Sequence, residues 1–171
     1  MSTGLNMSAT SKSLSPLVVR DGTSDDIERV SPMWTDLYDH EEAHGMMLKL
    51  SEGAVTTWAR QMCSRLDAST TLFLVAEHEG VISGFFTAQI KMLPPMYRDG
   101  LVASMQELYV EPQYRGRGIA RALVAEAVER FKEQGVTSIE GQIVRGDSTS
   151  LQFWKSLGWE LELVQIRKKL T

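Results

Sequence analysis

The sequence predicts an α/β fold built on one mixed, mostly antiparallel sheet with helices on both of its faces. Residues 71–77 and 81–92 each read as a strand, and the residues between them, His78-Glu79-Gly80, are typical of a tight turn. Two strands joined by so short a turn run antiparallel. The second half of the chain instead alternates strand, helix, strand, helix and strand, which implies a right-handed crossover and at least one parallel pair. The two halves together therefore predict a mixed sheet.

The other elements follow from hydrophobic spacing and from residues that start or stop a helix. A helix is expected to begin at Asp25 or Asp26, because an Asp side chain accepts hydrogen bonds from the first free N–H groups of a helix. Gly135 is expected to end the strongest helical pattern. The remaining predicted strands are 17–20, 104–110, 137–144 and 161–169, and the later predicted helices are 54–66, 117–134 and 148–157.

Length and composition are those of an ordinary globular protein. The chain has 171 residues, 43% of them hydrophobic and 23% charged, and 18 Lys and Arg against 22 Asp and Glu give a net charge of −4. We expect one domain over residues 17–171, preceded by a Ser- and Thr-rich leader, residues 1–16, that has too little to bury and is disordered. The acidic balance argues against nucleic acid as a partner, and no apolar run is long enough to span a membrane.

Cysteine usage indicates a reducing compartment. The single cysteine, Cys63, cannot form an internal disulfide, and the start of the chain lacks the pattern of a secretory signal. We therefore expect a cytoplasmic protein. Cys63 lies in a helical pattern between Met62 and Leu66 and is expected to be a core thiol rather than a nucleophile.

The most informative segment joins the strand that ends at Val110 to the helix that follows, and reads EPQYRGRGIARAL from residue 111. Pro112 stops the strand, and Gly116 and Gly118 allow backbone N–H groups to approach a ligand without obstruction by Cβ atoms. The start of a helix adds unpaired N–H donors and the positive end of the helix dipole. The junction is predicted to bind an anion, and a tight strand-to-helix turn without a ligand is the alternative.

This junction resembles the signature of the GNAT family of N-acetyltransferases. The spacing Gln113-x-x-Gly116-x-Gly118 matches that family's Arg/Gln-x-x-Gly-x-Gly/Ala motif, and the runs LYV before it and FWKSLGW after it occur in the family's order. The resemblance extends to the element order of most of residues 17–171. It implies the family's fold, in which a parallel strand pair is splayed to admit acetyl-CoA.

By this resemblance acetyl-CoA is the co-substrate, and its pyrophosphate would lie on the backbone N–H groups of residues 115–120. Its pantetheine arm would pair with the strand 108–110, and a β-bulge near Tyr109 would direct a backbone N–H at the thioester carbonyl as an oxyanion donor. The residues expected to bind the cofactor are Leu108, Tyr109, Val110, Arg115, Gly116, Arg117, Gly118, Ile119, Ala120, Phe153 and Trp154.

Acetyl transfer to an amine requires a base, because the amine must attack unprotonated. With an amine pKa near ~10.4, only about one molecule in a thousand is neutral at pH 7. Glu107, beside the predicted thioester, is the candidate general base, and an exposed strand carboxylate without a catalytic role is the alternative. Trp154 stands where the family has a tyrosine that protonates the leaving thiol, and an indole cannot transfer that proton. Asp147, where the family often has Asn, is expected to cap the last helix.

One more motif, His40-Glu41-Glu42-Ala43-His44, matches the His-Glu-x-x-His pattern of zinc peptidases. Its longer form needs Gly and His where the chain has Met47 and Leu50, and Gly45 argues that the helix ends at once. No metal site is therefore expected.

The same stretch is expected to border the acceptor site instead. Asp36 and Glu41 would attract a cationic amine, and Tyr97 would lie on the opposite wall; a solvated helix end is the alternative. The sequence thus predicts an N-acetyltransferase that moves the acetyl group from acetyl-CoA to a primary amine of a small molecule by direct attack in a ternary complex. A protein N-terminal or lysine acetyltransferase and a non-catalytic acyl-CoA sensor remain alternatives. Whether the chain forms a homodimer, through its last strand or second helix, stays open.

Overall fold

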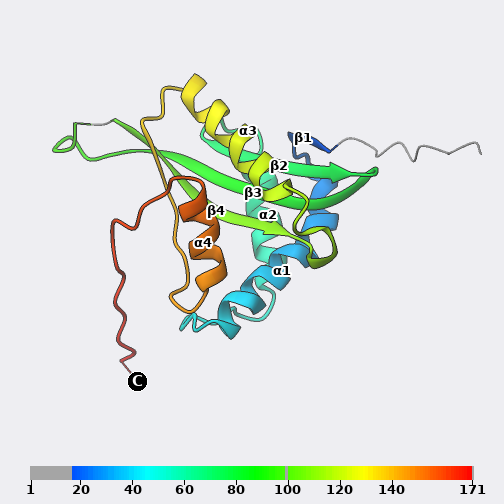
Figure 1. The fold of residues 1–171 in the computed structure, drawn as a ribbon, viewed down its shortest axis with the longest axis horizontal. Coiled ribbons are helices and arrows are strands. Elements are labelled where there is room, and N and C mark those ends of the chain that lie inside the picture. The colour runs from blue at the N-terminus through cyan, green and yellow to red at the C-terminus, as the bar shows by residue number, and fades with distance from the viewer. Residues whose placement is uncertain (1–16, 99, 171) are drawn as a thin grey trace, which may run out of the picture.

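The computed structural model describes residues 17–98 and 100–170, in which a five-stranded sheet carries helices on both faces (Figure 1). The expected leader, residues 1–16, lies outside the described residues. The strands are β1 (Val18–Asp21), β2 (Thr71–His78), β3 (Val81–Met92), β4 (Leu101–Val110) and β5 (Ser138–Glu140). The α-helices are α1 (Ile27–Ala43), α2 (Ala54–Arg65), α3 (Ile119–Glu133) and α4 (Ser148–Ser156), and two 3-10 helices are η1 (Ser24–Asp26) and η2 (Pro112–Tyr114).

The sheet has the strand order β1-β2-β3-β4-β5, and its topology confirms the predicted mixed α/β fold. The first four strands pair antiparallel, whereas β4 and β5 run parallel and are connected through α3. β4 and β5 pair only from Val102↔Ser138 to Ser104↔Glu140. The last part of β4 therefore has no strand beside it on that edge within the described residues, and this splay creates the site described below.

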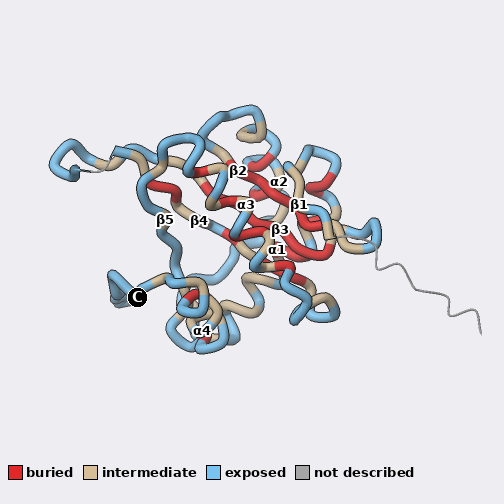
Figure 2. The backbone as a smooth tube through the Cα atoms, turned by 45° about the horizontal axis from the view of Figure 1, so that its top comes forward, coloured by how far each residue is buried: buried red, intermediate tan, exposed pale blue. Residues whose placement is uncertain are grey.

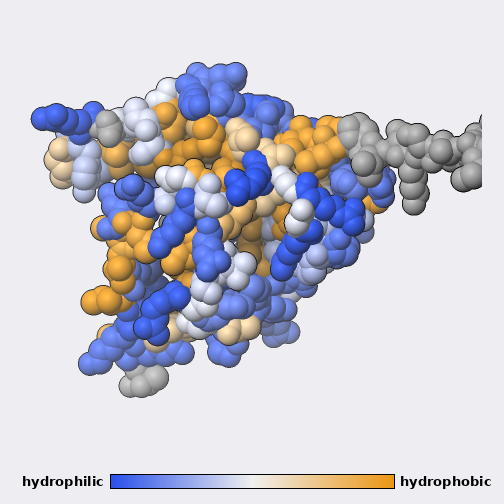
Figure 3. Space-filling view, in the orientation of Figure 1, coloured by the Kyte–Doolittle hydropathy of each residue, from blue (hydrophilic) through white to orange (hydrophobic). Residues whose placement is uncertain are grey.

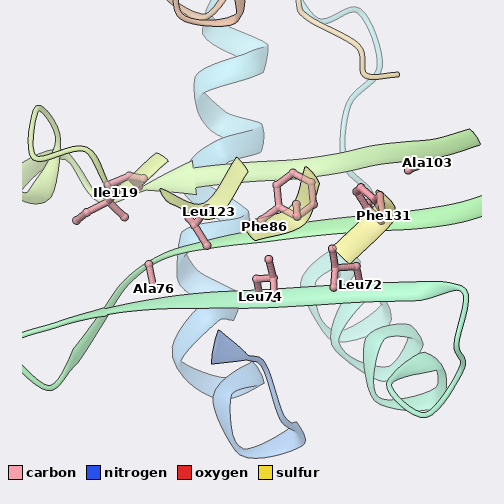
Figure 4. Close-up of a cluster of buried hydrophobic side chains, with 11 residues drawn as sticks. Leu72, Leu74, Ala76, Phe86, Ala103, Ile119, Leu123 and Phe131 are labelled. Atoms are coloured by element: carbon pink, nitrogen blue, oxygen red, sulfur yellow. The ribbon is translucent and has the colours of Figure 1, made fainter. Parts of the chain in front are cut away.

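Two apolar clusters hold the helices to the sheet, and Figure 2 shows the buried positions concentrated along its central strands. On one face, Leu123 and Phe131 of α3 pack against Leu74 and Phe86 (Figure 4). On the other face, α1 and α2 pack on the sheet through a second cluster that includes Trp34, Trp58 and Phe85. Full burial of one such side chain contributes about 1.5–3 kcal/mol, so both helical layers are firmly placed.

The structure contradicts two predictions made from the sequence, one about the last strand and one about Cys63. The predicted strand over 161–169 does not form: these residues carry no regular structure, and Leu163, Val164 and Ile166 are 84–92% exposed. A strand needs a neighbouring edge to supply its hydrogen bonds, and the described chain brings none to this segment. Cys63 is exposed rather than part of the core, because α2 buries Trp58 and Met62 on its other face.

No helix in residues 17–98 and 100–170 combines the length and the apolar character that crossing a membrane requires.

Candidate active site

A cavity of about 590 Å³ opens where β4 and the chain after β5 diverge. One wall is β4 together with the loop that leads into α3, the opposite wall is residues 142–144 and α4, and the end of α1 borders it as well. The lining includes Gln106, Leu108, Tyr109 and Val110 of β4, Arg115, Gly116, Gly118, Ile119, Ala120 and Arg121 at the start of α3, and Phe153 and Trp154 of α4.

The glycine loop is open to this cavity. Gly116 and Gly118 have φ of +76° and +82°, values that residues with a Cβ adopt only under strain, and no atom lies within 4 Å of the place where a Cβ would stand. Gly118 directly precedes α3, so the free N–H groups of the first helical turn begin there. The site predicted to bind an anion therefore has room for one.

Two arginines add positive charge beside this loop. Arg115 donates from Nε to the carbonyl oxygen of Val110 at 2.8 Å, and Arg121 donates to the hydroxyl of Ser156 at 2.8 Å, which ties α3 to α4. Both arginines line the cavity. Arg117 does not line it and lies over the ring of Tyr114, with 5.7 Å between the guanidinium carbon and the ring centre. A diphosphate fits this donor set, with backbone N–H groups in front and two guanidinium groups at the side.

The β-bulge on β4 lies at Gln106 rather than at Tyr109. Thr87 pairs with Glu107 and Ala88 with Met105, which leaves Gln106 as the extra residue. Tyr109 sits in regular pairing, so the predicted position of the bulge is wrong. The side chain of Tyr109 extends toward α1, where its hydroxyl donates to Asp36 at 3.4 Å.

Glu107 is buried beneath α1 and does not line the cavity. Its side chain accepts hydrogen bonds from the indole N–H of Trp34 at 3.0 Å and from the hydroxyl of Thr87, and the residue is only 5% exposed. Burial raises the pKa of the Glu107 carboxyl, and the hydrogen bonds from Thr87 and Trp34 oppose that rise. The sequence identified this carboxylate, but not the indole that closes over it.

Of the three residues predicted to face the acceptor, the structure brings Glu41 to the cavity. Burial raises the pKa of the Glu41 carboxyl, and the nearby charge of Glu107 raises it further. Asp36 is exposed, does not line the cavity and accepts a hydrogen bond from the Tyr109 hydroxyl. Tyr97 is 61% exposed on the loop between β3 and β4, which extends away from the helices (Figure 1).

Sequence reasoning did not give His40 and Asp147 a joint role, yet they meet at the cavity. Nε2 of His40 lies 2.8 Å from Oδ2 of Asp147, where the end of α1 reaches the start of α4 (Figure 1). Asp147 caps α4 as expected, accepting from the backbone N–H of Ser150 at 2.9 Å. In the sequence, His40 stood out through the His-Glu-x-x-His motif and Asp147 through its predicted capping role. Only the tertiary fold brings the two residues together.

His44 lies against this pair. Its ring centre is 4.0 Å from that of His40, and its Nδ1–H donates to the His40 carbonyl oxygen at 2.7 Å. One atom each of His40, His44 and Asp147 lie within 4.8 Å of one another, a spacing that a metal ion can use. The expectation of no metal therefore remains a prediction.

Trp154 is 6% exposed and packs between Phe153 and Trp159, with ring centres 5.1 and 4.6 Å apart. It closes the α4 wall as a packing residue, in line with the expected loss of the proton-donating tyrosine.

A family model described as the acetyltransferase (GNAT) family matches residues 32–159. Over 88 residues the chain is 32% identical to an uncharacterised N-acetyltransferase of Methanocaldococcus jannaschii, a match that covers 52% of this chain and 38% of that protein. The chain thus spans well under two thirds of this relative.

Two solved structures share the fold. One is described as a predicted acetyltransferase of Clostridium acetobutylicum with acetyl-CoA; it is 18% identical, has a TM-score of 0.74, and the match covers 90% of this chain and 96% of that one. The other is AAC(6')-Iy in complex with the bisubstrate analogue CoA-S-monomethyl-acetylneamine, which is 18% identical, has a TM-score of 0.71, and is covered in full against 91% of this chain. Because the family model spans most of the sequence, including the glycine loop and α4, the chain belongs to the acetyltransferase (GNAT) family.

Proposed function

We propose that this protein is an N-acetyltransferase that moves the acetyl group of acetyl-CoA to the primary amine of a small molecule, in a ternary complex. The observation that carries the proposal is the shape of the cavity, which joins an open glycine loop to the unpaired edge of β4. A diphosphate needs converging N–H donors, and an amide-containing arm binds to a free strand edge as an additional strand. The glycine loop and the free edge of β4 adjoin in one cavity, as the diphosphate and the amide arm of one extended cofactor require.

The chain's own residues divide the work of binding. Backbone N–H groups of residues 115–120 would hold the diphosphate, and Arg115 and Arg121 would add charge. The edge of β4 at residues 108–110 would hold the amide arm, with Phe153 and Trp154 packed against it. The sequence predicted the backbone N–H of Tyr109 as the oxyanion donor, but regular antiparallel pairing directs this N–H at Phe85 of β3. The donor would instead be the N–H of a neighbouring residue, such as Leu108, on the free edge of β4.

The acceptor amine would lie beside Glu41, whose carboxylate attracts a cation. Glu107 is one candidate for the general base, supported by the raised pKa that burial gives it. His40, which lines the same cavity, is the second candidate. The replacements Glu107→Gln and His40→Gln separate the two.

A non-catalytic acyl-CoA sensor is the second candidate function, and the buried Trp154 in place of the thiol's usual proton donor favours it. Acetylation of a protein N-terminus or lysine is the third. Cytoplasmic location and the absence of nucleic-acid and membrane partners are part of the proposal, supported by the net charge of −4 and the single cysteine.

The test is release of CoA thiol from acetyl-CoA across a panel of spermidine, glucosamine, kanamycin, free amino acids, and peptides with a free N-terminus or a lysine. The proposal expects turnover with at least one small amine and none with the peptides. Turnover confined to peptides would support the protein acetyltransferase. Acetyl-CoA binding without any turnover would support the sensor, and failure to bind acetyl-CoA would overturn all three.

A further inference from the structure

We propose that His40, oriented by Asp147, is the base that takes the proton from the acceptor amine. The inference rests on the proposed function and assigns a catalytic group within it. It arises from one contact, the hydrogen bond of 2.8 Å between His40 Nε2 and Asp147 Oδ2 at the cavity.

The charge of Asp147 fixes which nitrogen of the His40 ring donates to it. Burial alone would raise the pKa of the Asp147 carboxyl, but hydrogen bonds from Ser150 and His40 outweigh it and lower that pKa to about 2. At neutral pH the side chain is an anion that only accepts hydrogen bonds. Nε2 of His40 therefore donates to Asp147, and in a neutral imidazole this leaves the lone pair on Nδ1.

The pair is held rigidly although its members lie far apart in the sequence. A Cβ on Gly146 would stand 2.2 Å from the carbonyl oxygen of His44, so only glycine lets the loop before α4 come this close to the end of α1. The hydroxyl of Ser150 also donates to Asp147 Oδ2, at 2.6 Å, and the ring of His44 lies against that of His40. A base placed in advance needs no reorganisation when the substrate arrives.

Access to the cavity distinguishes His40 from Glu107. His40 lines the cavity and its side chain is 36% exposed, whereas Glu107 is sealed by Trp34 and Thr87. Glu41 also lines the cavity, and its carboxylate would hold the substrate ammonium by charge. The arrangement gives binding to Glu41 and proton removal to His40.

The step balances with these groups. The acceptor ammonium gives one proton to Nδ1 of His40 and attacks the thioester carbonyl carbon, forming the C–N bond. The C–S bond then breaks, and the nitrogen gives its second excess proton to the departing thiolate, so that the products are an amide and a free thiol. His40 releases its proton to water through the cavity. No protonated tyrosine is required, which accommodates Trp154.

The groups that bear on a pH profile are those around the imidazole. Glu41 and His44 on α1 and Asp147 before α4 are its immediate titratable neighbours. Tyr109 of β4, Arg115 of the glycine loop and Arg121 of the first turn of α3 line the same cavity.

The test uses the acceptor found in the panel and compares wild type with His40→Gln, Glu107→Gln and Glu41→Gln. We expect His40→Gln to lower kcat about 100-fold, since a positioned base contributes roughly 10²–10⁴. Its rate should also lose the rise with pH that wild type shows, and its affinity for acetyl-CoA should stay within about twofold, because the diphosphate site is elsewhere. Glu41→Gln should mainly raise KM for the amine, and Glu107→Gln should lower kcat much less than His40→Gln does.

Asp147→Asn tests the positioning role separately, because Asn still caps α4 but no longer enforces the protonation of Nε2. Asp147→Asn should lower kcat for the panel amine. With hydroxylamine as the acceptor, which is neutral at pH 7 and needs no base, the kcat of Asp147→Asn should return toward that of wild type. The kcat of His40→Gln should recover in the same way. The ¹⁵N spectrum of the His40 ring should show the Nε2–H tautomer in wild type. Glu42→Gln, on the exposed side of α1, is the matched control and should match wild type.

Three results would overturn the inference. The first is an unchanged kcat and pH profile in His40→Gln while wild type turns over, which leaves the acetyltransferase intact. The second is a bound zinc ion, with His44→Gln as damaging as His40→Gln and activity lost in EDTA. The third is no turnover by wild type with any acceptor, which removes the proposed function as well.

Discussion

Glu107 illustrates how burial changes the behaviour of a carboxylate. Because burial raises its pKa above the usual 4.5, the folded protein favours the neutral form. Stability from this group is fully present below the unfolded pKa and is lost as the pH rises through the folded pKa. Above the unfolded pKa, Glu107 therefore weighs against folding, because the unfolded chain ionises it at less cost than the buried site does.

We predict that Glu107→Gln raises Tm at pH 8, because Gln retains an acceptor for Trp34 without the buried charge. The gain should shrink toward pH 4, where the carboxyl of wild type is already neutral. Thermal unfolding of both proteins from pH 4 to 8 measures this, with the exposed Glu52→Gln as a control. A variant that is less stable than wild type at pH 8 and equal to it at pH 4 would contradict the prediction.

For single residues, the sequence was sufficient to identify the glycines of the loop, but not the hydrogen-bond partners of Glu107 and His40. Gly116 and Gly118 stand two residues apart in one loop, so local spacing was sufficient to predict that no Cβ obstructs the backbone there. The bonds from Trp34 to Glu107 and from His40 to Asp147 join residues 73 and 107 positions apart, respectively. Only the tertiary fold brings such pairs together, and single-sequence patterns carry no record of it.

At the scale of elements, the site depends on the contact between the end of α1 and the loop before α4. Gly146 permits this contact, since its absent Cβ leaves room for the carbonyl oxygen of His44. Apart from the strand predicted over 161–169, the helices and strands were predicted near their observed positions, because burial of one face imposes a regular period on the sequence. The hydrophobic period did not predict where β4 and β5 diverge. As a result β5 is three residues long, Ser138–Glu140, whereas the predicted strand covered 137–144.

We predict that Gly146→Ala forces these elements apart and destabilises the protein by about 1–3 kcal/mol, the usual cost of inserting a carbon into a packed contact. Gly100→Ala is the matched control, because no atom lies within 4 Å of its added Cβ. Urea unfolding of the two variants measures the difference. Equal stabilities would show that the loop moves without cost.

At the scale of the whole molecule, residues 161–170 form an exposed segment rich in apolar side chains, and no strand of the described residues pairs with it. Leu161, Leu163, Val164, Ile166 and Leu170 are 63–92% exposed, and apolar side chains follow the path of this segment in Figure 3. A second cavity, of about 510 Å³, lies beside β5 and is lined by Phe131, Ile139 and Trp159 among others. β5 is also the last strand of the sheet, with a free outer edge in the described chain. Free edges of this kind pair with strands of other chains.

We therefore predict a homodimer in which residues 161–169 of one protomer add to β5 of the other. In a two-fold symmetric dimer each protomer contributes its own segment and pairs with the partner's, so the β5 edges of both protomers are covered. Light scattering with size exclusion should give a dimer for the full chain and a monomer for a chain that ends at Glu160. Ile166→Asp should weaken the dimer more than the polar Gln165→Asp. A full chain that is monomeric at high concentration, or a truncated chain that remains dimeric, would contradict this.

The central claim is that the glycine loop binds the diphosphate of acetyl-CoA, and calorimetric titration of acetyl-CoA tests it most directly. Gly118→Ala and Gly135→Ala form a matched pair, because φ is +82° at Gly118 and +74° at Gly135, and both lack neighbours within 4 Å of an added Cβ. Only Gly118 lines the cavity. The account predicts that wild type and Gly135→Ala bind alike, whereas Gly118→Ala binds at least about tenfold more weakly, or ~1.4 kcal/mol. No binding by wild type, or equal binding by all three proteins, would contradict it.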